Sequence, residues 1–439
     1  MGLLTFKGGI HPNDGKSLAK DKAIVEVLPE GDLVFPLSQH IGAPAAPIVK
    51  VGDQVLKGQK IAEAGGFVSA PVYSSVSGKV KAIAPYFTPT GGKVSSIIVE
   101  NDGAYTEAER LSTRPLEMLS KEEILNLIAE AGIVGMGGAG FPTRVKLSPK
   151  EPEKIEYVIA NCAECEPYIT ADYRRMMENP EDLVEGMRVI LKLFDNATGI
   201  FAVEDNKPDC IEKLEKLTSG EPRMEVAKLM TKYPQGGERQ LIYAVTKRAI
   251  NSSMLPADVG CVVDNVETII HIYDAVVNGR PCIDRVVTVS GDGIMNPGNF
   301  KVPLGMNQQE LVNVAGGFQG TPEKIVSGGP MMGFAMFTLD VPVTKTSSSI
   351  LCMTKDEVAK YEPSACINCG RCIEACPSRL IPSRLADYAE RHDEAASEKE
   401  FGVECMECGS CSYFCPAKRQ LKQAISSMRK TVLANRKKK

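Results

Sequence analysis

The sequence predicts a multidomain α/β protein that begins with a β domain and ends with a small, cysteine-rich, α-helical domain. Its 439 residues correspond to roughly three domains at about 150 residues each. In the first hundred residues, alternating apolar residues separated by Gly-Asp and Lys-Gly turns predict short antiparallel strands. In the centre, a strand pattern followed by polar residues is typical of an open α/β sheet. Near the C-terminus, eight of the fourteen cysteines form two similar runs.

Composition and charge exclude several classes of protein. Hydrophobic residues make up 43% of the chain and charged residues 24%, which is average for a soluble globular protein. Lys and Arg number 51 against 55 Asp and Glu, so a generally basic nucleic-acid binder is excluded. No apolar run reaches the roughly 18 residues that span a bilayer, and the first residues lack a signal-peptide core. We therefore expect no transmembrane segment and a cytoplasmic location.

The N-terminal β domain is predicted from short apolar segments joined by turns, such as 49–61 and 76–80. The pattern resembles the barrel-sandwich fold of biotinyl and lipoyl carriers. Those carriers modify a lysine at a hairpin tip, but residues 61–78 contain no lysine. We therefore expect this domain to be a structural or docking unit.

A glycine-rich segment, Gly135-Met-Gly-Gly-Ala-Gly-Phe-Pro142, follows a predicted helix. Ser120 and Glu123 form a capping box for that helix, and Gly132 can end it. Because Pro142 disfavours a long helix starting inside the glycines, the segment is predicted to be a loop rather than the turn of a Rossmann dinucleotide motif. Its bare backbone would let a flat ring or a phosphate approach closely.

Polar residues follow the next predicted strand, at 155–160. Asn161, Glu164 and Glu166 come directly after it, at the edge where ligands of open α/β sheets bind. An ordinary solvated turn is the alternative interpretation. Cys162 and Cys165 form a lone C-x-x-C pair in the same segment, for which a redox or metal role is the less favoured interpretation.

Residues 284 to about 343 predict strands around one helix. They resemble the soluble-ligand-binding β-grasp module. The glycines at 328, 329 and 333 are interpreted as turn formers rather than as a second cofactor loop.

Two four-cysteine runs near the C-terminus share the spacing C-x2-C-x2-C-x3-C, and each ends in proline. This spacing is typical of proteins that bind two [4Fe–4S] clusters, because three thiolates of a run wrap one cube and the fourth ligates the other. The predicted ligands of one cluster are Cys366, Cys369, Cys372 and Cys415. Those of the other cluster are Cys405, Cys408, Cys411 and Cys376.

The surroundings of the two runs carry further expectations. The fourth cysteine of each run is expected to start a helix, and the spacer 378–404 is expected to hold a helix around Leu385 and Tyr388. A pair of zinc knuckles is the alternative, but zinc has no use for the Cys-Pro ending of both runs.

The residues after Pro416 form a basic tail, with nine Lys or Arg and no acidic residue. Its apolar residues recur at helical spacing, which predicts either an amphipathic helix lying on an acidic partner or anionic lipid, or a solvated terminus. They are Leu421, Ile425, Met428 and Val432.

Four loops resemble the flavin and NADH loops of the NADH-binding flavoprotein subunit of respiratory complex I. They are 135–146, 161–167, 233–239 and 263–268. Together with Gly-Gly-Ile-His-Pro near the start and the paired cysteine runs, their order is similar to that of the RnfC family. This family belongs to the Rnf complex, a membrane-associated ferredoxin:NAD oxidoreductase coupled to ion translocation. The similarity covers essentially the whole chain.

The resemblance implies FMN and NAD(H) as ligands. It places Glu166, the candidate catalytic residue, near the flavin and nicotinamide, and Phe141 on the NADH adenine. The other implied contacts are Gly135, Gly137, Gly138, Gly140, Lys146, Asn161, Glu164, Tyr233, Gly236, Glu238, Asn265 and Thr268. The chain departs from the complex I pattern by having Met136 for Arg, Ala163 for Asp, Gly237 for Glu and Asp264 for Asn. Each departure removes or alters a polar contact.

The expected domains are a barrel-sandwich β domain (1–110), a Rossmann-like α/β domain for flavin and NADH (115–282) and a β-grasp domain (283–345). An α-helical, ferredoxin-like domain for two [4Fe–4S] clusters (355–420) and the basic tail (421–439) follow.

The resemblance implies an enzyme subunit that exchanges hydride with NAD(H) at FMN and passes single electrons through the two clusters. A cobalamin (corrinoid) reductase with the same cofactors and a non-catalytic iron–sulfur relay or assembly subunit are the alternatives. The implied partners are integral membrane and iron–sulfur subunits of an Rnf-type complex, with ferredoxin reached indirectly and no nucleic acid. The implied location is the cytoplasmic side of the cell membrane, as a peripheral subunit.

Overall fold

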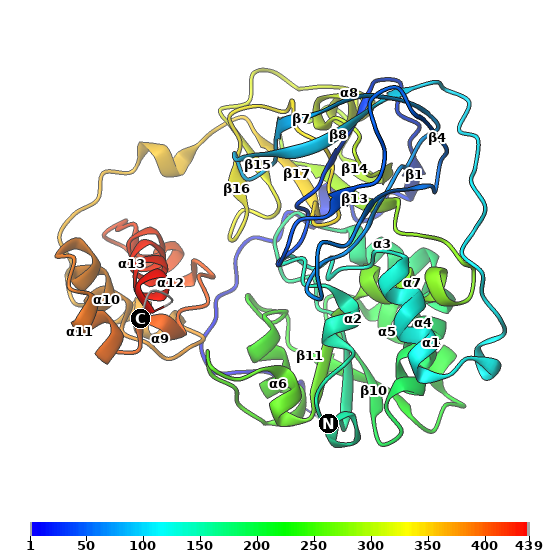
Figure 1. Ribbon diagram of the computed structural model, residues 1–439. Helices are drawn as coiled ribbons and strands as arrows, with labels where there is room; N and C mark the ends of the chain where they lie inside the picture. The colour runs from blue at the N-terminus through cyan, green and yellow to red at the C-terminus, as the bar shows by residue number, and fades with distance from the viewer. Residues whose placement is uncertain (1, 437–439) are drawn as a thin grey trace.

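The computed structural model describes residues 2–436, in which a larger body built on β-sheets carries a smaller helical lobe (Figure 1). The lobe lies at the left of the view, in orange and red, and an extended connection joins it to β17 (Ser349–Met353) of the body. The first residues of the chain run along the side of the body that faces the lobe. None of the described helices is long and apolar enough to cross a membrane.

Short antiparallel strands build the N-terminal β domain, which confirms the prediction from its turns. One sheet has the order β2-β8-β7-β4, formed by β2 (Leu33–Pro36), β4 (Gln54–Val55), β7 (Gly78–Phe87) and β8 (Lys93–Asn101). The other has the order β3-β5-β6, formed by β3 (Ala46–Pro47), β5 (Lys60–Glu63) and β6 (Val72–Tyr73). Side chains of both sheets, among them Phe35 and Ile61, share one core.

A four-stranded parallel sheet forms the centre of the body. Its order is β11-β10-β9-β12, with β9 (Tyr157–Cys162), β10 (Thr198–Glu204), β11 (Met224–Leu229) and β12 (Cys261–Asn265). The helices of this domain are α1 (Lys121–Glu130), α2 (Thr143–Lys146), α3 (Ala171–Glu178), α4 (Pro180–Leu193), α5 (Pro208–Thr218), α6 (Glu238–Thr246) and α7 (Val266–Val276). The strand order reverses at β9, because β10 and β11 lie on one side of it and β12 on the other. Open α/β sheets bind ligands at the carboxyl ends of strands beside such a reversal.

The local signals at the start of this domain are confirmed. Ser120 and Glu123 form the capping box of α1, and α1 ends just before Gly132, whose φ is +72°. The strand β9 begins two residues later than predicted, since a 3-10 turn (Pro152–Lys154) precedes it.

A six-stranded mixed sheet follows in the sequence and packs beside the N-terminal domain (Figure 1). Its order is β1-β14-β13-β17-β15-β16, with β1 (Ile24–Glu26), β13 (Asp284–Ser290), β14 (Gly298–Pro303), β15 (Lys324–Ser327) and β16 (Phe334–Ala335). The predicted single helix is α8 (Gln308–Val314). The N-terminal segment supplies β1, which pairs in parallel with β14, and β17 pairs with β13.

The helical lobe contains both cysteine runs. Its helices are α9 (Arg371–Ala375), α10 (Pro382–Glu390), α11 (Glu394–Lys399), α12 (Ser410–Phe414) and α13 (Leu421–Arg436). The predicted spacer helix is therefore confirmed as α10. The prediction that Cys376 and Cys415 start helices is wrong, because each ends a short helix with extended backbone, at ψ 116° and 112°. The proline that follows each cysteine disfavours helical backbone at the residue before it.

The basic tail forms α13, and the chain itself covers the apolar face of this helix. Its apolar residues are buried against the rest of the lobe, including Leu385 of α10 and Val403. The prediction that this face lies on a partner or on lipid is therefore wrong. Arg419 and Arg429 pair with carboxylates of the lobe as well. The last three lysines lie outside the described residues.

Candidate nucleotide and iron–sulfur sites

The predicted nucleotide residues gather at the carboxyl ends of β9 and β12, where the strand order of the parallel sheet reverses. Asn161 and Asn265 are register neighbours at this edge. Asn161 donates a hydrogen bond from Nδ2 to the carbonyl of Gly236 at 2.8 Å. Asn265 caps α7 by accepting from the Glu267 N–H at 3.0 Å, and donates to the Asp172 carboxylate at 2.7 Å. Three chain segments are thus fixed around one crevice.

The glycine segment forms the predicted loop and closes on itself. The N–H of Gly135 donates to the carbonyl of Phe141 at 2.8 Å, so the two ends of the loop lie side by side. Thr268 lies beneath the loop, fully buried, and accepts the N–H of Met136 at 2.9 Å. A Cβ at Gly137 would lie 3.0 Å from the Cβ of Asn265, whereas one at Gly138 would meet no atom within 4 Å. The loop therefore packs on the sheet edge by one part and leaves its tip open.

The barrel-sandwich side of the protein supports the end of this loop. The N–H of Ile41 donates to the carbonyl of Gly140 at 3.1 Å. A Cβ at Gly140 would lie 2.9 Å from the Thr346 side chain and 3.2 Å from the Gln39 carbonyl. Gly140 is therefore required where the N-terminal domain approaches the loop.

Lys146 lies at the end of α2 and faces the carboxyl end of β12. Its Nζ donates to the carbonyl of Val263 at 2.7 Å and lies 3.2 Å from Oδ1 of Asp264. Burial lowers the pKa of Lys146, but the carboxylates of Asp264 and Glu238 outweigh burial and raise it. The only lysine among the predicted contacts therefore stays protonated in a place that is rich in carboxylates.

Glu164 points into the protein, where its side chain is 3% exposed. One oxygen accepts the N–H of Asp172 at 2.7 Å, and the other lies 3.7 Å from Nζ of Lys16. Lys16, itself buried, also donates to the carbonyls of Glu164, Glu166 and Ile169 at 2.9, 3.0 and 2.5 Å. The N-terminal segment thereby shapes the loop that carries both predicted glutamates.

Glu166 lies where three parts of the chain meet. Its carboxylate accepts the N–H of Met331 at 3.2 Å, and the Tyr233 hydroxyl, whose one proton points mainly to another acceptor, makes a longer contact at 3.4 Å. A Cβ at Gly329 would lie only 2.1 Å from Oε2 of Glu166, so the glycine lets this loop close over the carboxylate. Burial raises the pKa of Glu166 to about 7, although both contacts act to lower it. The glycines at 328–333 thus do more than form a turn, since they enclose Glu166.

Tyr233 connects the nucleotide domain to the helical lobe. Its side chain is 1% exposed, and its hydroxyl donates to the carbonyl of Cys408 at 2.8 Å. The same ring packs in a small cluster with Ile10, Ala375 and Cys408, to which Cys165 and Met331 add partly buried atoms. Tyr233 therefore faces a predicted cluster ligand rather than open space.

Further contacts fix the lobe against the body. Gly9 donates its N–H to the carbonyl of Ala375 at 3.0 Å, and Arg239 pairs with Glu404 at 2.9 Å. A Cβ at Gly237 would lie 2.7 Å from Cε of Met406, which stands between two predicted cluster ligands. The departure from Glu to Gly at position 237 thus leaves room for the lobe.

The cysteines of the lobe group across the two runs, as the crosswise assignment requires. A cavity of about 330 Å³ is lined by four cysteines from both runs, Cys366, Cys369, Cys372 and Cys415. In the other set, burial raises the pKa of the Cys405 thiol to about 12, and the neighbouring Cys408 and Cys376 raise it further. Burial likewise raises the pKa of Cys411, with added contributions from Cys408, Cys405 and Cys376. Thiols crowded in this way fit a cluster whose positive iron favours the thiolate form. Within residues 2–436, no three His, Cys, Asp or Glu lie close enough together to hold a single metal ion.

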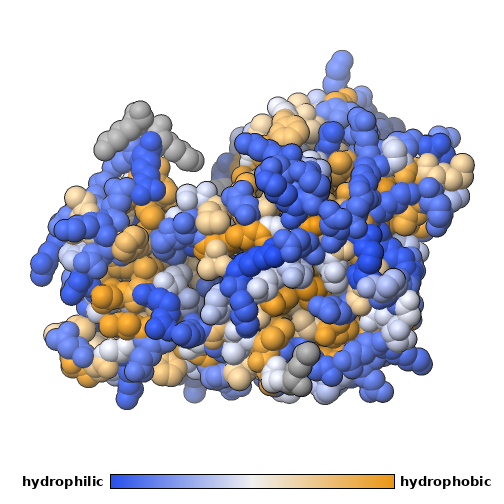
Figure 2. Space-filling view, turned by 90° about the horizontal axis from the view of Figure 1, so that it is seen from below, coloured by the Kyte–Doolittle hydropathy of each residue, from blue (hydrophilic) through white to orange (hydrophobic). Residues whose placement is uncertain are grey.

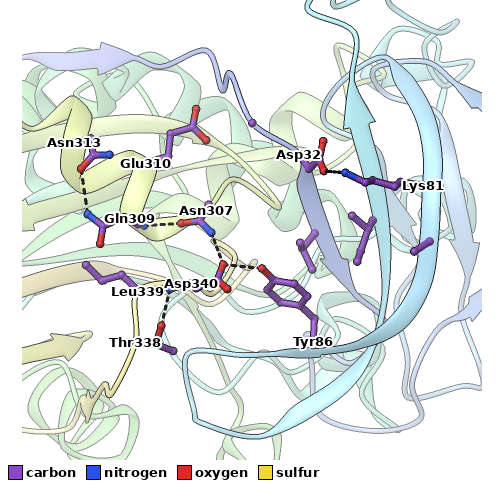
Figure 3. A pocket seen from close by; sticks show the side chains of 14 residues that line it. Asp32, Lys81, Tyr86, Asn307, Gln309, Glu310, Asn313, Thr338, Leu339 and Asp340 are labelled. Atoms are coloured by element: carbon purple, nitrogen blue, oxygen red, sulfur yellow. Dashed lines mark hydrogen bonds and ion pairs between the residues drawn. The ribbon is translucent and has the colours of Figure 1, made fainter.

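Another cavity lies away from all of these residues. It measures about 750 Å³ and opens between the N-terminal β domain and the α8 region (Figure 3). Its polar side chains bond to one another: Tyr86 and Asn307 both donate to Asp340, at 2.6 and 2.8 Å, and Lys81 pairs with Asp32 at 2.7 Å. None of the predicted site residues lines it.

Several residues that shape the site carry no sequence signal. Besides Lys16, Lys207 is buried and donates to the carbonyl of Ala163 at 2.6 Å, and Glu204 lies 3.5 Å from it. Asp172 holds Asn265, and burial raises the pKa of Asp172 to about 7, helped by Glu164 and Glu267. These charged residues belong to no recognisable sequence motif. Only the helix pattern around Asp172 could have suggested a residue at the first turn of α3.

Comparison with protein families divides the chain into four matched segments. Residues 4–104 match the RnfC barrel sandwich hybrid domain, and residues 128–274 match the Nuo51 FMN-binding domain. Residues 286–335 match the SLBB domain, and residues 359–416 match a 4Fe-4S dicluster domain. The four matches follow the order of the observed units.

Two relatives are similar over nearly the whole chain, and each is the C subunit of a ferredoxin:NAD(+) oxidoreductase complex. That of the proton-translocating complex of Clostridium ljungdahlii is 47% identical over 403 residues, covering 91% of this chain and 88% of the relative. That of the Na(+)-translocating complex of Acetobacterium woodii is 43% identical over 437 residues, covering 99% and 98%.

Two solved structures of an NAD+-reducing [NiFe]-hydrogenase share the fold at 19% identity. The H2-reduced form gives a TM-score of 0.51 over 73% of this chain and 62% of the hydrogenase chain. The air-oxidized form gives 0.53 over 75% and 72%.

Proposed function

Because this chain belongs to the RnfC family of ferredoxin:NAD(+) oxidoreductase complexes, we propose that it carries electrons between NAD(H) and one-electron partners through FMN and two [4Fe–4S] clusters. The contact of Tyr233 with both Glu166 and Cys408 carries this proposal, since it joins the nucleotide crevice to a cluster ligand. FMN, when bound, takes a hydride from NADH as an electron pair and returns single electrons.

The crevice at the ends of β9 and β12 fits FMN. The open tip of the glycine loop leaves room for a flat ring or a phosphate, and Lys146 supplies positive charge at the end of β12. Asn161 and Asn265 present side-chain amides at the same edge. Phe141 and the exposed part of the loop would bind the adenine of NAD(H). Glu238, at the start of α6, would line the side of the site near Lys146. Thr268 supports the loop from below.

Glu166 would hold the nicotinamide side of the site. Its carboxylate is fixed by Met331 and Tyr233, so its position does not depend on a ligand. Glu164 would act indirectly, because its oxygens face Asp172 and Lys16 inside the protein.

The geometry favours a definite order of the clusters. The set Cys405, Cys408, Cys411 and Cys376 would hold the cluster nearer to the flavin. Its Cys408 accepts from Tyr233, and Gly8 packs against the Cys376 carbonyl. The set Cys366, Cys369, Cys372 and Cys415 would hold the outer cluster, because Cys366 and Cys369 are exposed.

Electrons would leave the subunit at the outer cluster. Ile367 and Ile373, which line the cavity with its four cysteines, are 67% and 40% exposed. Seen from below, the surface of the molecule is largely hydrophilic, with hydrophobic patches on both the body and the lobe (Figure 2). We assign the outer face of the lobe to an iron–sulfur partner of the complex. We further place the subunit peripherally on the cytoplasmic side of the membrane, bound to integral membrane subunits.

The finer domain assignment is a Rossmann-like flavin domain at 115–282 and a β-grasp domain at 283–345, between the barrel-sandwich domain at 1–110 and the cluster domain at 355–420. The two relatives carry names with different translocated ions, although both are similar to this chain. We therefore place the choice of ion in the partner subunits.

Anaerobic purification followed by spectroscopy tests the proposal. We expect about eight irons with acid-labile sulfide, and a flavin absorption that NADH bleaches. A Cys408→Ser variant should keep the flavin response but lose reduction of the outer cluster, whereas a Cys369→Ser variant should keep one cluster that NADH reduces, seen by EPR. Eight irons without flavin or NADH response would instead indicate a relay subunit, and absence of labile sulfide would refute the proposal.

A further inference from the structure

The Asp264 carboxylate is buried in the crevice with one charged partner. Its side chain is 1% exposed, and Oδ1 lies 3.2 Å from Nζ of Lys146. Beyond this ion pair, no N–H or O–H in residues 2–436 donates a hydrogen bond to either oxygen. Buried carboxylates are normally held by several hydrogen bonds, so this one is unusually poorly satisfied.

The pair lies at the carboxyl end of β12, the edge to which the proposed flavin site belongs. Asp264 is the second-last residue of β12 and lies opposite Ala160, one residue before the paired Asn161 and Asn265. Lys146 is 24% exposed and is the only lysine that the glycine loop and α2 bring to this edge. Its Nζ is already used by the Val263 carbonyl and by Asp264.

The local charge works against an incoming anion. Lys146 faces the carboxylates of Asp264 and of Glu238, the first residue of α6. Two carboxyl groups therefore surround one ammonium group, and Arg239 is a further cation that acts on Glu238. A phosphate monoester would therefore meet repulsion from Asp264 and would have to compete with it for Lys146.

We propose that Asp264 sets the phosphate selectivity of the flavin crevice, because its carboxylate competes with the flavin phosphate for Nζ of Lys146. This inference rests on the proposed binding of FMN in the crevice. Asp264 thus lowers the preference of the protein for FMN over riboflavin, which has the same ring system but lacks the phosphate. Asn, the residue of the complex I pattern, would leave Lys146 free for the phosphate.

The test compares FMN with riboflavin on the full chain. Anaerobically purified protein with intact clusters is freed of flavin by dialysis and titrated with each flavin, and binding is followed by quenching of flavin fluorescence. We expect Asp264→Asn to tighten FMN binding about tenfold or more while riboflavin binding stays within about twofold. Lys146→Gln should weaken FMN binding and leave riboflavin unchanged. The control is Glu215→Gln, which removes a carboxylate from a surface pair with Lys228 (2.9 Å).

The outcomes separate this inference from the proposed function. If both flavins bind but Asp264→Asn does not change their ratio of affinities, the role of Asp264 is refuted and the flavin site stands, whatever Lys146→Gln does. If neither flavin binds to the wild type or to any variant, the proposed function fails and the inference fails with it. Should Asp264→Asn not fold, Asp264→Ser is measured in its place, and an unchanged ratio of affinities refutes the role of Asp264.

Discussion

The hydroxyl of Tyr233 donates to the carbonyl of Cys408 at 2.8 Å, although the two residues belong to different domains. Because the same hydroxyl also lies 3.4 Å from Glu166, a single buried side chain joins the predicted nucleotide residues to a predicted cluster ligand. The lobe is therefore best described as built into the site rather than tethered to it.

Tyr233→Phe should loosen this contact. The variant leaves a buried carbonyl without its donor, which costs about 1–3 kcal/mol. We expect slower reduction of the clusters by NADH in anaerobic stopped-flow measurements, and faster hydrogen exchange of residues 371–376 at the interface. Tyr413→Phe is the matched control, since Tyr413 is half-exposed on the same lobe. Equal rates in wild type and Tyr233→Phe would contradict the assigned role.

Crosswise ligation of the clusters can be separated from ligation within each run. In the crosswise arrangement Cys369 and Cys415 serve the same cluster. The double variant Cys369→Ala, Cys415→Ala should then keep one intact cluster, with about four irons, like either single variant. The pair Cys369→Ala, Cys376→Ala should lose both clusters. Iron analysis that gives the opposite result for the two double variants would mean that each run holds its own cube.

Gly329→Ala should displace the Glu166 carboxylate, although Gly329 belongs to a different domain. The added Cβ would lie 2.1 Å from Oε2 of Glu166, so the carboxylate or the loop must move and the bond from Met331 is strained. We expect a loss of about 1–3 kcal/mol in the free energy of unfolding, measured by anaerobic denaturant titration. Gly92→Ala is the control, because its Cβ would meet no atom within 4 Å. A Gly329→Ala protein as stable as the control would show that the loop does not hold the carboxylate.

Glu166 should make stability depend on pH. Its pKa is raised from 4.5 to about 7, so the folded protein binds its proton more tightly than the unfolded chain does. The free energy of unfolding should therefore fall as pH rises from about 4.5 to about 7 and level off above. Glu166→Gln removes this component, so the variant should gain stability relative to wild type between pH 5 and pH 8.

The control for this measurement is a carboxylate whose pKa is lowered, rather than raised, in the folded protein. The hydrogen bond from Arg248 lowers the pKa of Glu156, so Glu156 adds stability as pH rises and the variant Glu156→Gln should show the reverse trend. A stability difference between wild type and Glu166→Gln that does not change with pH would contradict the raised pKa.

Features that depend on neighbouring residues could be predicted from the sequence. Contacts between different domains could not. The capping box at Ser120 and the loop at 135–142 depend on neighbouring residues, and both occur as expected. The predicted helix starts at Cys376 and Cys415 are wrong, although the following proline is visible in the sequence and disfavours helical backbone at the residue before it.

The site itself shows the same division. Motif spacing marks the glycines and asparagines of the crevice, but Lys16 and Met331 reach Glu166 and its loop from about 150 and 165 residues away. Nothing near Lys16 distinguishes it from a surface lysine. Likewise the sequence predicts that Tyr233 faces a nucleotide, yet its hydroxyl faces Cys408, a partner that only the docked lobe supplies.

The N-terminal segment has partners throughout the chain: Ile10 pairs with Tyr233, Gly9 with Ala375, and β1 with β14. During synthesis these residues leave the ribosome first, while residue 375 emerges last among their partners. Ile10 and β1 can therefore pair as soon as residues 233 and 303 have been made, whereas the contact of Gly9 must wait for residue 375. Docking of the helical lobe would therefore be the last step in fixing the N-terminal segment, because, of these three pairings, only the one with Ala375 depends on the lobe.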